Sequence, residues 1–66
     1  MRTYTPKEVI RLLEQHDFVL SRSRGSHHIY RHPDGRKVIV PFHNKDLPKG
    51  TLMSIIKQSG IPRKTF

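Results

Sequence analysis

The sequence predicts an α+β domain in which two helices pack on one face of a three-stranded antiparallel sheet, in the order α-β-β-β-α. Three observations predict this fold. A helix-start signal stands near the beginning of the chain, three short runs rich in β-branched and aromatic residues fill its middle, and a second helical pattern follows them. Helices on a single face bury one core, so the other face of the sheet is left open to solvent or to a ligand.

The first helix is expected to run from about residue 6 to residue 16. Thr5 provides the N-cap, Pro6 takes the first helical position, where its missing N–H is harmless, and Glu8 completes a capping box. Asp17 ends the helix in the left-handed conformation, which Asp tolerates better than most residues. Four side chains follow at helical spacing, and Ile10 widens the apolar face that they form: Val9, Leu12, Leu13 and His16.

Three strands are expected over residues 18–23, 26–32 and 36–42. Gly25 separates the first two strands. The turn "PDG" at 33–35 places Pro and Gly where a tight hairpin needs them, so the strands form an antiparallel meander.

The second helix is expected over about 49–59, with an apolar stripe on one side. Gly60 fits the left-handed position that follows a helix, and Ile61 behind it completes a Schellman-type stop. The tail "RKTF" (63–66) is expected to be loose. Residues of the stripe are Leu52, Ile55 and Ile56.

Length and composition indicate one domain, residues 1–66, with a hydrophobic fraction of 33% that allows only a small core. No stretch approaches the roughly 18 apolar residues of a membrane span. The N-terminal residues lack the apolar segment of a secretory signal, and the absence of Cys excludes a disulfide framework or a thiolate metal site. A cytoplasmic protein without membrane contact is the default expectation.

The charge is strongly basic, with 13 Lys and Arg against 5 Asp and Glu, a net charge of +8. Because cations that neutralise phosphates release counterions, such a chain is expected to bind nucleic acid with a steep salt dependence. Charge alone does not identify the polyanion.

The histidines of the middle segment do not form a metal site with one another. His27 and His28 point to opposite faces of a strand, and His28 and His32 lie four residues apart, or roughly 13 Å, whereas zinc ligands lie about 2 Å from the ion. A site that recruits the distant His43 or His16 is left open, and no metal or other cofactor is expected.

Strand alternation divides these side chains between two faces. Tyr30 is expected to join Val38 and Val40 in the core, so His28 and His32 lean inward or toward the margin of the sheet.

His27 and Ile29 then lie on the open face, and His27 is expected beside Arg31, with Arg22 and Arg24 close by in the preceding strand. The alternative is that His27 is an ordinary exposed strand histidine.

The chemistry available to these residues is narrow. The five acidic residues are scattered and show no pairing that would hold two catalytic metal ions. Ser26 is not expected to act as a nucleophile activated by His27, because adjacent strand residues face opposite ways and no carboxylate that could orient His27 is near in sequence. A lone imidazole among cations is suited to RNA, which carries its own nucleophile in the ribose 2′-OH. His27 would transfer the proton and Arg or Lys would stabilise the phosphorane, whereas DNA would not be cut.

The chain resembles the HicA family, toxins of the HicAB toxin–antitoxin modules that act as mRNA interferases. The resemblance spans nearly the whole chain and rests on an ordered set of segments. The chain differs from the common family pattern in two places. Asp17 stands where many relatives have Gly, and a few extra residues precede Thr5. The segments are "LLEQHDF" (12–18), Arg24 before "GSHH" (25–28), "RHPDGRKVIVP" (31–41), "KDLPKGTL" (45–52) and "QSGI" (58–61).

The resemblance implies a fold like the double-stranded RNA-binding domain and metal-independent cleavage of RNA. It implies that His27, the first His after Gly-Ser, is catalytic and that Gly25 is the family's glycine. It also implies a HicB-type antitoxin that packs over the toxin and covers the active histidine, with no contact between the toxin alone and DNA. Residues expected to bind the RNA are Gly25, Ser26, Arg22, Arg24, Arg31 and Lys37.

Two other functions remain open. A non-catalytic RNA-binding module is the main alternative, because this fold commonly reads double-stranded RNA by its shape and backbone. A protein that only docks onto another protein would show no affinity for RNA at low salt.

Overall fold

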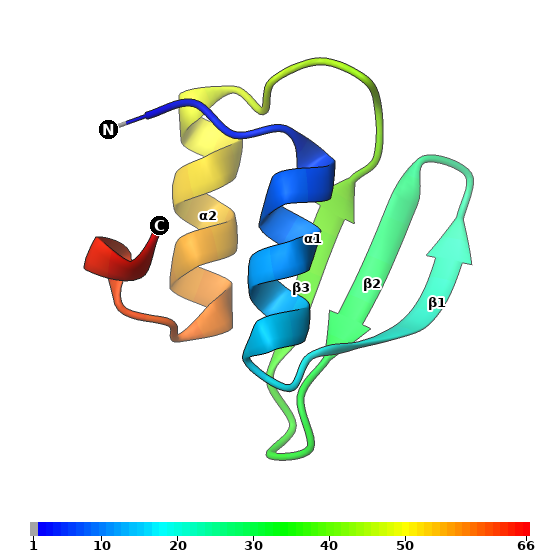
Figure 1. The fold of residues 1–66 in the computed structure, drawn as a ribbon. Helices are drawn as coiled ribbons and strands as arrows, with labels where there is room; N and C mark the ends of the chain where they lie inside the picture. The colour runs from blue at the N-terminus through cyan, green and yellow to red at the C-terminus, as the bar shows by residue number, and fades with distance from the viewer. Residues whose placement is uncertain (1) are drawn as a thin grey trace.

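The expected order of elements is confirmed in a computed structural model that describes residues 2–66. The fold is of the α+β class, like a double-stranded RNA-binding domain (Figure 1). The elements are α1 (Pro6–Gln15), β1 (Val19–Arg24), β2 (His27–Arg31), β3 (Lys37–Pro41) and α2 (Lys49–Ser59).

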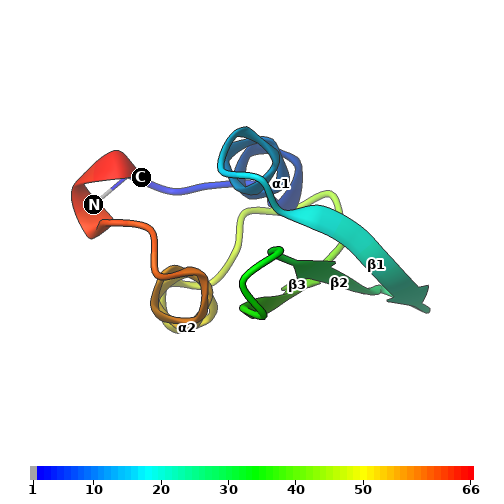
Figure 2. The same cartoon turned by 90° about the horizontal axis from the view of Figure 1, so that it is seen from below.

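The three strands form one antiparallel sheet in the order β1-β2-β3. Figure 2 shows α1 above the sheet and α2 along the side of β3, while β1 extends away from both helices. On that side of β3, the Ile39 N–H donates to Gln58 Oε1 of α2 at 3.2 Å. A bulge interrupts the pairing of β1 with β2 between Leu20 and Arg22.

The capping signals of α1 act as the sequence predicts. The Glu8 N–H donates to Thr5 Oγ1 at 3.3 Å, and the Thr5 N–H donates to Glu8 Oε1 at 2.9 Å. This backbone donation from Thr5 is the main cause that lowers the pKa of Glu8, and the nearby Arg2, which pairs with Glu8 at 2.7 Å, lowers the pKa further. Asp17 follows the helix with φ of 69°, which confirms its left-handed conformation.

The core lies between the helices and the helix-facing side of the sheet. Leu12 is half-buried and packs against the core from its rim, as expected for the apolar face of the helix, whereas Leu13 is fully buried. The two leucines are 100° apart around the helix, and only one of them points at the sheet. The buried apolar side chains are Tyr4, Val9, Leu13, Phe18, Tyr30, Val38, Val40, Leu47, Leu52, Ile55, Ile56 and Ile61.

No side chain of β1 is buried, although this strand forms a complete edge of the sheet. Val19 is 66% exposed and Leu20 is 47% exposed. The ladder to β2 is therefore the main attachment of β1 to the rest of the fold.

The C-terminal residues are ordered, so the expectation of a loose tail is wrong. Arg63–Thr65 form a short 3₁₀ helix, η1, and the ring of Phe66 packs edge to face on Tyr4, with centroids 5.9 Å apart. Tyr4 is itself buried, and its carbonyl accepts from the Leu47 N–H at 2.7 Å. An apolar contact between the two ends of the chain thus orders a segment whose own sequence is polar and basic.

Candidate functional site

His27 opens β2 on the face of the sheet that the helices leave uncovered. It pairs with Arg24 of β1 on one side and with Pro41 of β3 on the other, and its side chain is exposed. Cross-strand partners lie on the same face, so these three residues form the first row of the open face, next to the β1–β2 turn.

A second row crosses the sheet roughly 7 Å from the first. It consists of Arg22, Ile29 and Ile39, which are partners in the register. Ile39 is 38% exposed and Ile29 is half-buried, so the centre of the open face is apolar. The bulge after Leu20 matters here, because it turns Leu20 toward the helix side while Arg22 faces the open side.

The third row contains Val19, Arg31 and Lys37. Arg31 therefore shares the face of His27 but lies four residues along the strand from it, roughly 13 Å. The expectation that Arg31 stands beside His27 is wrong, and the cation directly opposite His27 is Arg24.

Gly25 and Ser26 form the turn that presents His27. Gly25 has φ of 58°, and no heavy atom beyond its two chain neighbours lies within 4 Å of the place that a Cβ would take. The glycine is therefore required by the backbone conformation and not by lack of space. Phe42, the residue after β3, donates its N–H to the Ser26 carbonyl at 2.6 Å and so ties the turn to the third strand.

The other four histidines each have a structural contact. The His16 Nδ1 lies 2.8 Å from the Leu12 carbonyl oxygen, and the His43 Nδ1 accepts from the Lys45 N–H at 3.2 Å. The His28 ring stacks on Phe42, and the His32 ring packs edge to face on Phe18. Among residues 2–66, His27 is the histidine whose imidazole has neither a hydrogen bond nor a ring contact, so both of its ring nitrogens are open to a ligand.

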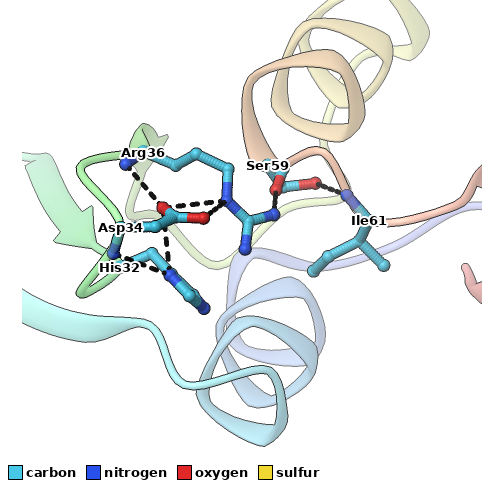
Figure 3. A network of polar contacts seen from close by, with 5 residues as sticks. All are labelled: His32, Asp34, Arg36, Ser59 and Ile61. Atoms are coloured by element: carbon cyan, nitrogen blue, oxygen red, sulfur yellow. Dashed lines mark hydrogen bonds and ion pairs between the residues drawn. The ribbon is translucent and has the colours of Figure 1, made fainter.

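His32 belongs to a polar network that joins the β2–β3 turn to the end of α2 (Figure 3). Its Nδ1 lies 3.0 Å from Asp34 Oδ1, and Arg36 Nε donates to Asp34 Oδ2 at 2.9 Å. Arg36 Nη1 donates in turn to the carbonyl of Ser59, whose Oγ accepts from the Ile61 N–H at 3.1 Å. The network is structural, and it places His32 at the far margin of the sheet from His27.

The environment of Asp34 favours its charged form. The backbone N–H of Arg36 is the largest cause that lowers the pKa of Asp34, and the guanidinium of Arg36 and the ring of His32 act in the same direction. The pKa of the Tyr30 phenol changes in the other direction: burial in the core raises it, and the charge of Glu14 adds to that effect.

Within the described residues, no three His, Asp or Glu side chains gather closely enough to hold a metal ion. Neither of the helices there has the length and apolar character needed to cross a bilayer.

The sequence-based reasoning missed two residues near His27. Pro41 is the partner of His27 in the first row, and Phe42 carries the ring that stacks on His28. Alternation along β3 contained the signal, because Val38 and Val40 face the core and Pro41 must therefore face His27.

Fold and surface together define a class of protein: a small α-β-β-β-α domain whose uncovered sheet face is basic and presents one free imidazole. The profile of the family described as "HicA toxin of bacterial toxin-antitoxin" matches residues 6–61. The chain belongs to this family of toxins. A comparison with curated proteins finds no match.

Proposed function

We propose that this chain is a metal-independent endoribonuclease, the toxin of a type II toxin–antitoxin module, and that His27 is its general acid or base. The observation that carries the proposal is the position of His27, exposed at the head of β2 and directly opposite Arg24. The remaining histidines are engaged in structural contacts, as described above.

The reaction needs only proton transfer and charge stabilisation from the protein. The 2′-oxygen of a ribose attacks the adjacent phosphorus, the bond from phosphorus to the 5′-oxygen breaks, and a 2′,3′-cyclic phosphate remains. His27 takes the proton from the 2′-OH while water protonates the leaving 5′-oxygen, or His27 gives a proton to the 5′-oxygen while water accepts the one from the 2′-OH. Arg24 and Arg22, on the first and second rows, stabilise the negative charge of the phosphorane. General acid–base catalysis contributes about 10²- to 10⁴-fold, so positioning of the RNA must supply much of the remaining rate enhancement.

The other proposed contacts follow the rows of the sheet. Gly25 and Ser26 bring backbone groups to the phosphate at His27. Arg31 and Lys37, roughly 13 Å away on the third row, bind phosphates further along the same mRNA strand.

A HicB-type antitoxin is the proposed protein partner. The open face combines cations with the apolar pair of half-buried Ile29 and exposed Ile39, so an antitoxin surface with acidic residues around an apolar centre would match it. Such a partner would cover His27 and exclude RNA. The proposed location of the module is the cytoplasm, where mRNA is translated.

The deciding experiment incubates the purified protein with RNA and with DNA of the same sequence in excess chelator. The wild type should cut RNA and leave DNA intact, and His27→Ala should not cut RNA. His43→Ala is the matched control, because His43 is also exposed but lies in the loop after β3 and not on a strand of the sheet. Each variant is checked for folding, and His27→Ala should change the free energy of unfolding by no more than about 0.5 kcal/mol.

Two results would overturn the proposal. If His27→Ala cuts RNA as fast as the wild type, His27 is not the catalytic residue. If the wild type retains RNA in a salt-dependent way but yields no cleavage products, the chain is a non-catalytic RNA-binding module.

A further inference from the structure

We propose that the stacked rings of Phe42 and His28 form a platform that binds an unpaired nucleobase of the RNA strand cut at His27. The inference deepens the proposed function, on which it rests, because it defines the substrate as single-stranded at the site of cleavage.

The two rings are nearly parallel, with centroids 4.5 Å apart and planes inclined by 7°. This is the offset-stacked arrangement in which aromatic rings, including nucleobases, extend a stack. Both side chains are half-buried and therefore keep part of their surface open to solvent. Ser23, the β1 partner of His28, is exposed, so the helices do not cover this end of the sheet.

The platform is held rigidly beside the His27 turn. Phe42 is fixed by the bond from its N–H to the Ser26 carbonyl at 2.6 Å. His28 is fixed by its place in the sheet, between Ser23 of β1 and Val40 of β3. A preformed aromatic surface loses little conformational freedom when a base stacks on it.

His27 and His28 are consecutive, so their Cα atoms lie about 3.8 Å apart while their side chains leave the sheet on opposite faces. A strand that presents a phosphate to His27 can place a neighbouring base on the Phe42–His28 stack only by crossing the end of the sheet at Gly25. The side of Gly25 on which a Cβ would lie is open, with no heavy atom beyond the two chain neighbours within 4 Å of that position.

This path distinguishes single-stranded from double-stranded RNA. A base within a duplex is already stacked on both sides and paired along its edge, whereas an unpaired base is free to stack on an aromatic side chain. The fold alone suggests binding of duplex RNA, so the platform makes the opposite prediction.

The alternative is that the rings only cover the margin of the core, since Val40, the partner of His28 in the sheet, is fully buried. Both readings predict half-buried rings, and they differ in what happens to RNA when the aromatic face is removed. The test therefore exchanges the ring for an apolar side chain of similar size and measures RNA binding and cleavage as well as folding.

The variants are Phe42→Leu, which removes the aromatic ring, Phe42→Tyr, which keeps one, and Phe66→Leu, which is the matched control. Phe66 is also a half-buried aromatic residue, but it packs on Tyr4 near the two ends of the chain, on the far side of α2 from β1 and β2 (Figure 1). Thermal unfolding checks that all three variants remain folded.

Cleavage is measured with a single-stranded oligoribonucleotide and with a hairpin of the same sequence. For the single strand, Phe42→Leu should raise KM about tenfold and leave kcat nearly unchanged, because a stacked base contributes binding that is equal in the ground state and the transition state. Phe42→Tyr and Phe66→Leu should both keep the KM of the wild type.

Binding is measured separately in the His27→Ala background, so that the RNA stays intact. The probe is an oligoribonucleotide containing 2-aminopurine, whose fluorescence falls when it stacks. Quenching should occur with His27→Ala and with the added Phe66→Leu, and it should be lost with the added Phe42→Leu.

The outcomes separate this inference from the proposed function. If RNA is cut at His27 but Phe42→Leu changes neither KM nor quenching, the platform is wrong and the proposed function stands. If the wild type cuts no RNA but Phe42→Leu abolishes quenching, the platform stands and the proposed catalysis is wrong. A preference for the paired stem of the hairpin also overturns the platform.

Discussion

Removing one cation from the open face should reduce the salt dependence of RNA binding by a predictable amount. The four cations there are Arg22, Arg24, Arg31 and Lys37. Each phosphate neutralised on a single strand contributes about −0.7 to the slope of log K against log salt concentration, so four contacts give a slope of about −2.8. Affinity should then fall about 50-fold between roughly 50 and 200 mM salt.

Arg24→Gln should reduce the slope to about −2.1, and the corresponding loss of affinity should be only about 20-fold. Lys64→Gln is the control, because it lowers the net charge by the same single unit but lies in η1, away from the sheet. Fluorescence anisotropy with a labelled oligoribonucleotide, in the His27→Ala background over a series of KCl concentrations, measures both slopes. Equal changes for Arg24→Gln and Lys64→Gln would refute the reasoning, because RNA would then respond to net charge and not to the open face.

Two predictions concern the fold. Leu13→Ala should lower the free energy of unfolding by about 2–5 kcal/mol, since Leu13 is fully buried, and Leu12→Ala should cost clearly less. Urea denaturation followed by circular dichroism measures both, and equal losses would contradict the difference in burial. Because the pKa of Asp34 is lowered in the folded state, its ionisation stabilises the fold above its ordinary pKa, and this contribution is lost as pH falls through the lowered pKa. Below about pH 4 the wild type should therefore lose stability more steeply than Asp34→Asn, and parallel curves of thermal unfolding against pH would count against the Asp34–Arg36 interaction.

Local signals in the sequence predict most of the secondary structure. The capping box of Thr5 and Glu8 and the left-handed Gly60 were predictable, because each depends on residues within one turn of the helix end. The loose tail was wrong, because the contact of Phe66 with Tyr4 joins opposite ends of the chain and has no local signature.

The open face was predictable in part. Alternation along β2 correctly separates the exposed His27 from the half-buried His28. The expectation that Arg31 stands beside His27 neglected their four-residue spacing along one strand, which the sequence does give. The register between strands is not encoded in the alternation, so the pairing of His27 with Arg24 could not be predicted from it. The bulge after Leu20 also has no clear sequence signal, yet it decides which side chains of β1 face the open side.

The exposure of every β1 side chain has a consequence for how this protein can change over time. Substitutions at exposed positions away from special features usually alter stability by no more than about 0.5 kcal/mol, so Arg22 and Arg24 can be exchanged without loss of the core. Val38 and Val40, two strands away, have no such freedom because they are fully buried. Selection on ligand preference can therefore act on Arg22 and Arg24 of β1 without disturbing the core, whereas β2 and β3 carry buried side chains as well as proposed RNA contacts and tolerate fewer changes.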